Sequence, residues 1–121
     1  MLGWAVPPEL RVEDALEPGS EVPPFYDSMV AKIIAAGPTR DEARARLLHG
    51  LRRMTALGVP TNQDFLARCL DHPVFAAGQA STGFIAQHAG ELLGADPARA
   101  AQEGILGALL LYLATEASGA R

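Results

Sequence analysis

Two polar residues, Tyr26 and Asp27, stand where a proline-containing stretch leads into an apolar segment. Pro23 and Pro24 precede them, and prolines keep a backbone extended and without N–H donors. A loop that enters a rigid strand is a common position for working polar groups. The carboxylate of Asp27 can accept several hydrogen bonds or pair with a cation. From the residues alone, an ordinary turn aspartate is an equally good interpretation.

Lys32 is the one charged residue in the apolar stretch from Met29 to Ala36. The β-branched residues Val30, Ile33 and Ile34 favour a strand covered on both faces, and a short buried helix is the alternative. A lysine in such a strand often only extends its charge to an edge. A functional partner for Lys32 is the less favoured interpretation.

Histidine and cysteine give weak signals for metal or nucleophilic chemistry. His49, His72 and His88 match no ligand spacing, and Cys69 offers a single thiol, so we expect scattered surface or half-buried histidines and no metal site. Cys69 falls in a helical pattern and is expected to be structural. The sequence also lacks the glycine-rich phosphate loop, the dinucleotide fingerprint and the nucleophile elbow. A self-sufficient nucleotide enzyme is therefore not indicated.

Composition and charge fit one folded domain of 121 residues, with 49% apolar residues and a net charge of −4. The acidic balance argues against a nucleic-acid or membrane partner. The longest apolar run, Gly104 to Thr115, is shorter than the roughly 20 residues that span a bilayer. The first residues do not form a secretory signal, and a single cysteine fits a reducing cytoplasm. The arginines of the first helix are expected to form a solvated face: Arg40, Arg44, Arg52 and Arg53.

The N-terminal half predicts short strands followed by one clear helix. Leu10–Val12 is a strand candidate, and Glu21-Val22 can return as a second strand after a turn. The helix should run from Thr39, its cap, to Leu57, with Glu42 completing a capping box and Gly58 ending it. Its apolar stripe lies at helical spacing: Ala43, Leu47, Leu51 and Met54, with Leu48 beside it.

The C-terminal half predicts further helices. One begins at Thr61–Asp64 and must end near His72, because the following proline disfavours helix there; its expected apolar residues are Phe65, Leu66 and Leu70. A single turn is expected at 75–78. Another helix is expected within Thr82–Leu93, carrying Phe84, Ile85 and Leu92. A last helix should start at Asp96-Pro97 and be buried against a partner, because 105–113 is apolar nearly all round.

The predicted fold is α+β: a small antiparallel sheet packed with helices, followed by a C-terminal apolar helix. Residues 1–93 form the expected domain, and residues 94–121 form a linker and helix leading toward the next domain.

Residues 21–35, Glu-Val-Pro-Pro-Phe-Tyr-Asp-Ser-Met-Val-Ala-Lys-Ile-Ile-Ala, resemble the C-terminal domain of biotin carboxylases. The order and spacing of further blocks match, so the resemblance covers about residues 2–93. Those blocks are Thr39-Arg40-Asp41-Glu42-Ala43, Leu57-Gly58-Val59-Pro60-Thr61-Asn62, Phe65-Leu66, His72-Pro73-Val74-Phe75 and Thr82-Gly83-Phe84-Ile85.

The resemblance implies a part of a larger ligase. In that family an ATP-grasp enzyme uses ATP, magnesium and bicarbonate to carboxylate biotin on a carrier domain. The sequence is similar to the α-subunit of acyl-CoA carboxylases, such as the acetyl-, propionyl- or methylcrotonyl-CoA enzymes, and the resemblance implies a role in fatty acid metabolism. Implied partners are the ATP-grasp part of the chain, a second protomer, the biotin carrier domain and the carboxyltransferase subunit. The groups that bind nucleotide, magnesium and bicarbonate have no counterpart here, so the chain alone should bind no cofactor, hold no catalytic residue and be inactive.

Individual residues carry over from the family motif. Tyr26 and Asp27 match a Tyr-Asp pair on the active-site side, where hydrogen bonds position other groups without proton transfer. Arg11 matches an arginine associated with the dimer interface, where it would pair with a carboxylate of the other subunit. Phe25 replaces a frequent tyrosine, which puts one hydroxyl contact in doubt. The family's domain begins before Leu2, so at least one strand is expected to be missing, and the unpaired edge predicts self-association.

An alternative hypothesis is a free-standing protein-interaction module derived from the same domain. It would bind a carboxylase or another protein through Arg11 and the last helix. Coding sequence upstream of Met1 with glycine-rich, lysine-bearing segments would favour the enzyme part, and a true start codon would favour the module.

Overall fold

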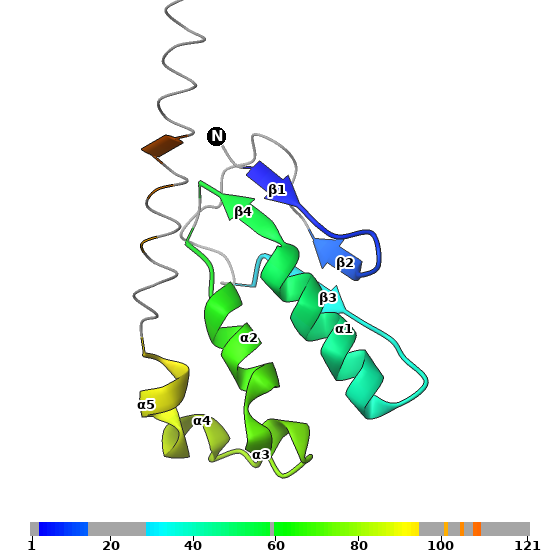
Figure 1. The fold of residues 1–121 in the computed structure, drawn as a ribbon, viewed down its shortest axis with the longest axis vertical. Helices are drawn as coiled ribbons and strands as arrows, with labels where there is room; N and C mark the ends of the chain where they lie inside the picture. Colours follow the sequence, from blue (N-terminus) through cyan, green and yellow to red (C-terminus); the bar gives the residue numbers. More distant parts are fainter. Residues whose placement is uncertain are drawn as a thin grey trace, which may run out of the picture. The chain divides into compact units, whose positions relative to one another are not determined.

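The computed structural model describes residues 3–14, 29–58 and 60–94, together with 101, 105, 108 and 109. Two compact units divide the chain, Met1–His88 and Ala89–Arg121, and each is described by itself. The first unit mixes strands and helices in this order (Figure 1): β1 Gly3–Ala5, β2 Arg11–Asp14, β3 Ala31–Ile34, α1 Arg40–Arg53, β4 Thr55–Leu57, α2 Gln63–Asp71, α3 Pro73–Ala76 and α4 Phe84–Gln87. The second unit contains α5, Ala89–Leu92.

The described strands pair as two antiparallel ribbons. In one, β1 runs against β4 with Trp4 opposite Ala56; in the other, β2 runs against β3 with Val12 opposite Ile33. The expected α+β class is confirmed, and strands form at Arg11–Asp14, shifted from the predicted 10–12, and at Ala31–Ile34, shorter than the predicted 29–36. Glu21-Val22 lies outside the described residues. Strand β1 was not predicted, because three residues with little β-branched content give almost no sequence signal.

Helix α1 begins as its sequence predicts and ends earlier than expected. Thr39 Oγ1 accepts from the Glu42 backbone N–H at 3.2 Å, as a capping residue should. The helix stops at Arg53, not at Leu57, because Thr55–Leu57 leaves it and pairs with β1. Long-range strand pairing here outweighs local helix propensity. Gly58, with φ of 91°, therefore follows β4 rather than ending the helix.

Helices α1 and α2 lie side by side (Figure 1) and share one core. Leu51 and Met54 of the predicted stripe are buried there, as is Leu48 beside it, whereas Ala43 and Leu47 are half-buried. On α2 the core positions are Ala67 and Leu70. Leu66, expected on the apolar face, is instead 37% exposed, because the helical phase turns Ala67 inward.

The arginines of α1 bind neighbouring elements, which the expectation of a merely solvated face did not foresee. The guanidinium of Arg40 donates to the carbonyls of Phe75 at 2.7 Å and Ala76 at 2.8 Å. Arg44 donates to the Leu70 carbonyl at 2.8 Å. These donors satisfy carbonyls at the ends of α2 and α3, where a helix lacks internal partners. Two further arginines pair with carboxylates: Arg52 with Asp71 and Arg53 with Glu9.

The single helix expected within Thr82–Leu93 is divided into α4 and α5. His88 leaves the helical conformation with φ −115° and ψ 21°. Phe84 is buried as expected, whereas Ile85 is 49% exposed. The expected last helix lies largely outside the described residues. Among the residues that the structure does describe, no helix is long and apolar enough to cross a membrane.

Candidate functional site

Strands β2 and β3 place three charged side chains on one face of their ribbon. Directly opposite residues of an antiparallel pair point to the same side, and successive residues alternate. Val12 and Ile33 are opposite each other and pack against the core, which defines the inner face. Arg11, Glu13 and Lys32 therefore occupy the outer face, since Glu13 lies opposite Lys32.

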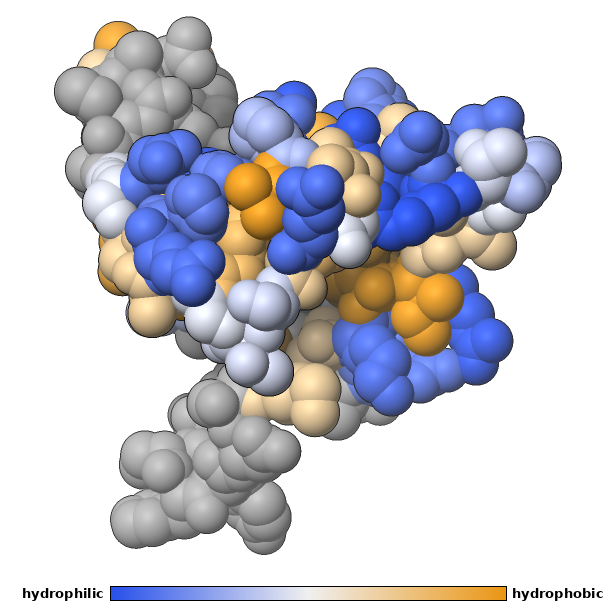
Figure 2. All heavy atoms as spheres, turned by 90° about the horizontal axis from the view of Figure 1, so that it is seen from below, coloured by the Kyte–Doolittle hydropathy of each residue, from blue (hydrophilic) through white to orange (hydrophobic). Residues whose placement is uncertain are grey.

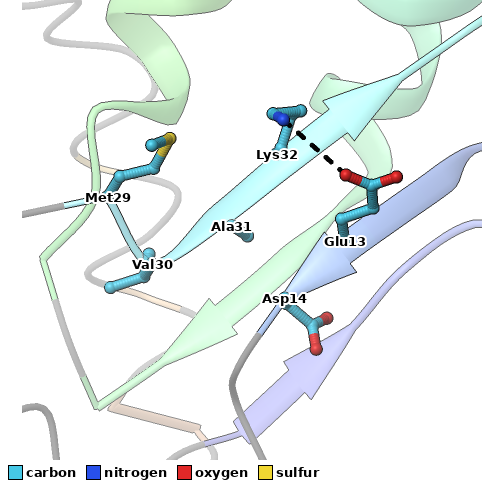
Figure 3. Close-up of a pocket in the computed structure, with 6 residues that line it drawn as sticks. All are labelled: Glu13, Asp14, Met29, Val30, Ala31 and Lys32. Carbon is cyan, nitrogen blue, oxygen red and sulfur yellow. Dashed lines mark ion pairs between the residues drawn. The ribbon is translucent and has the colours of Figure 1, made fainter.

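The carboxylate of Glu13 lies between the two cations of this face. Its Oε1 pairs with Arg11 Nη2, and its Oε2 lies 3.7 Å from Lys32 Nζ. Figure 3 shows Glu13 and Lys32 reaching toward each other from neighbouring strands. The side chains are 71% exposed for Arg11, 45% for Glu13 and 61% for Lys32. Exposed ion pairs of this kind add little to the stability of the fold. They do hold one negative and two positive side chains close together on this face. The exposed side chain of Lys32 also shows that β3 is not covered on both faces, although the sequence had predicted that it would be.

An open pocket of about 330 Å³ lies at the end of the same ribbon (Figure 3). Its lining combines two carboxylates, one ammonium group and apolar side chains: Glu13, Asp14, Met29, Val30, Ala31 and Lys32. Asp14 is held separately, because its Oδ2 accepts from Trp4 Nε1 at 2.8 Å. A pocket so open cannot exclude water from a reaction by itself. Chemically it can form one wall of a site that other parts complete.

Tyr26 and Asp27 lie outside the described residues. The segment 15–28 that contains them connects β2 to β3, and both strand ends line the pocket. In sequence, Asp27 precedes the pocket residue Met29 by two positions. The structure thus brings Arg11 and Lys32 together through Glu13, which the sequence did not single out. Spacing in the sequence could have identified Glu13, because residues 11 and 13 of one strand point to the same face of the sheet.

The histidines are structural or surface residues in the first unit. His72, expected at the surface or half-buried, is buried, and its Nδ1 accepts from the Val74 backbone N–H at 3.2 Å, capping α3. The rings of His72 and Phe84 pack edge to face, with their centroids 5.2 Å apart. His49 is exposed on α1, and His88 is half-buried.

Cys69 is half-buried on α2. Burial raises the pKa of its thiol, which favours the protonated, unreactive form. The expectation of a structural cysteine agrees with this position.

Apolar side chains reach the surface at separate places. Figure 2 shows polar and charged residues over most of the face drawn, with smaller apolar areas between them. In the first unit the large exposed apolar side chains come from different segments: Met29, Leu57, Leu66 and Ile85. Met29, 64% exposed, belongs to the pocket lining beside the charged face.

Comparison with known proteins identifies relatives across most of the described chain. The family model for the biotin carboxylase C-terminal domain matches residues 2–87. A biotin carboxylase of Halalkalibacterium halodurans is 42% identical over 88 residues, which are 73% of this chain and 20% of that protein. The mitochondrial methylcrotonoyl-CoA carboxylase subunit alpha of Arabidopsis thaliana is 39% identical over 99 residues, 82% of this chain and 14% of that protein. The chain thus spans a fifth or less of the length of these relatives.

Solved structures of biotin carboxylases also match this chain. The biotin carboxylase domain dimer of Hydrogenobacter thermophilus 2-oxoglutarate carboxylase, in complex with MgADP, ADP and bicarbonate, matches with a TM-score of 0.72 and 29% identity. That match covers 78% of this chain and 21% of the other. The biotin carboxylase subunit of a pyruvate carboxylase matches with a TM-score of 0.72 and 34% identity, covering 78% of this chain and 22% of that one.

Proposed function

The chain belongs to the biotin carboxylase C-terminal domain family, and we propose that it acts as the C-terminal part of the biotin carboxylase subunit of a biotin-dependent acyl-CoA carboxylase. The observation that carries the proposal is the match over residues 2–87, which contains both ribbons, α1 and α2. The complete carboxylase subunit, meaning this chain with an ATP-grasp part before it, would carboxylate biotin with ATP and bicarbonate. ATP, magnesium and bicarbonate would be bound by that other part.

Within this subunit the pocket end of the β2–β3 ribbon would wall the active site. Tyr26 and Asp27 lead into β3, and the first residues of that strand line the pocket together with Glu13 and Asp14. Their side chains would position reacting groups through hydrogen bonds without transferring protons. An open pocket whose lining mixes charged and apolar side chains fits the role of a wall better than that of a self-contained site.

The partners of the subunit would be a second protomer, the biotin carrier domain and the carboxyltransferase subunit, in the cytoplasm. Arg11 would support the protomer contact by binding a carboxylate of the other subunit. Its exposure and its place on a charged outer face support that assignment. Arg11 could instead act at the active site. The observation that favours this second role is that its partner Glu13 lines the pocket.

Replacing Arg11 by alanine in the complete subunit tests these roles separately. Loss of an interfacial charge contact should weaken dimerisation about tenfold or more, measured by sedimentation velocity over a concentration series. Arg53→Ala is the matched control, because it removes another exposed arginine–carboxylate pair, with Glu9. An unchanged dimer with reduced biotin-dependent ATP hydrolysis would overturn the interface role and assign Arg11 to the pocket side. No change in either quantity would contradict both roles.

A further inference from the structure

We propose that Glu13 is a positioning residue that holds Arg11 and Lys32 together on the outer face of the β2–β3 ribbon. The inference rests on the proposed function, in which this face meets an anionic group of a second protomer or of the active site. It adds the residue that keeps the two cations in place, which neither the sequence motif nor the family match identifies.

The geometry gives each cation its own carboxylate oxygen. Arg11 Nη2 pairs with Oε1 of Glu13, and Lys32 Nζ lies 3.7 Å from Oε2. Two features of the backbone impose this arrangement: Arg11 and Glu13 are two residues apart on β2, and Glu13 is directly opposite Lys32 on β3. Strand register therefore determines which carboxylate lies between the cations.

Two unfavourable effects oppose holding Arg11 and Lys32 side by side, and the carboxylate of Glu13 counteracts both. Arginine and lysine side chains lose rotamer entropy when they are fixed in one conformation. Without a carboxylate between them, two like charges on one small face would also repel each other. By pairing with both side chains, Glu13 already restricts their motion and reduces their repulsion before any ligand binds. An arginine has five N–H donors and a lysine has three, so donors remain on both cations for an incoming anionic group.

Asp14 cannot replace Glu13. It follows Glu13 in the strand and so points to the other side of the ribbon, where it accepts from Trp4 Nε1 at 2.8 Å. Figure 3 shows its carboxylate directed away from Glu13 and Lys32. The positioning role is therefore specific to residue 13 among the two adjacent acids.

The test is Glu13→Gln in the complete carboxylase subunit, compared with Glu13→Asp and with Glu9→Gln as a matched control. Glu9 forms the other exposed glutamate–arginine pair, with Arg53 at 2.6 Å. The quantity that Arg11→Ala lowers, dimer affinity or kcat/KM for biotin, should fall roughly threefold to tenfold in Glu13→Gln. Glu13→Asp should recover part of the loss, and Glu9→Gln should cause none. The melting temperature should stay unchanged in all three, because exposed ion pairs stabilise weakly.

Combining Glu13→Gln with Arg11→Ala distinguishes positioning from a general structural effect. The double variant should lose less than the sum of the two single losses, because Glu13 acts partly through the arginine. Fully additive losses, or a Glu13→Gln variant that equals the wild type while Arg11→Ala is impaired, would overturn the inference. If Arg11→Ala itself changes neither dimerisation nor turnover, the proposed function of this face fails instead.

Discussion

In the complete carboxylase subunit, Asp27→Asn is expected to lower the rate of biotin-dependent ATP hydrolysis by about tenfold to a hundredfold. The substitution keeps the size of the side chain and removes its negative charge. Hydrogen bonds to charged groups contribute roughly 1.5–3 kcal/mol, and about 1.4 kcal/mol corresponds to a factor of ten in rate. Steady-state kinetics with free biotin measures the effect. Because Asp27 is proposed to position reacting groups, kcat should fall more than the KM for ATP changes.

Asp41→Asn provides the control for this prediction. Asp41 is an exposed aspartate in the first turn of α1, so its replacement costs only the weak interaction with the helix dipole. Its kinetics should match those of the wild type. Equal kinetics for Asp27→Asn and Asp41→Asn would contradict an active-site position for Asp27.

A large loss of stability is expected for Gly50→Val in α1. Gly50 is buried, and a Cβ at this position would lie 2.6 Å from Leu10 Cγ and 2.9 Å from its Cδ2. Leu10 is itself only 8% exposed in the core, so it has little room to move away. Overpacking of this kind destabilises by about 1–3 kcal/mol or more. Urea denaturation, followed by fluorescence of the single tryptophan, Trp4, measures the loss.

Two further variants test whether the clash with Leu10 is the cause. Ala45→Val places the same branched side chain on an exposed position of α1 and should cost only a few tenths of a kcal/mol in helix propensity. Leu10→Ala alone should cost about 2–5 kcal/mol by leaving a cavity. Combined with Leu10→Ala, Gly50→Val should lose much less than the sum, because the valine fills that cavity. Simple additivity would show that the two residues are not in contact.

The sequence predicted those helices and strands that are determined by residues close together in the chain. Thr39 at the start of α1 and Pro73 after α2 identified helix ends, because capping and the restriction before proline act within a few residues. The apolar stripe that contains Leu51 identified the buried face of α1 by its helical spacing. In the same way, the β-branched residues of 30–34 identified β3.

The remaining structure depends on contacts between distant residues. Thr55–Leu57 continues a helical pattern and becomes a strand only because β1 is available to pair with it. The arginines of α1 looked like a solvated face, and only the tertiary fold brings carbonyls such as that of Leu70 within reach. Glu13 is likewise one acid among many until the register of β2 and β3 places it opposite Lys32. Tyr26 and Asp27 were found through a motif, not through geometry.

A chimera tests the central claim most directly. Residues 2–87 of this chain would replace the matching C-terminal segment of the Halalkalibacterium halodurans biotin carboxylase, with which the chain is 42% identical over 88 residues. The measurement is biotin-dependent ATP hydrolysis by the purified chimera, beside the truncated relative and the isolated chain. If this chain serves as the C-terminal part of a biotin carboxylase, the chimera hydrolyses ATP in the presence of biotin, and neither piece alone does. A chimera that folds and binds ATP without biotin-dependent hydrolysis would contradict that role.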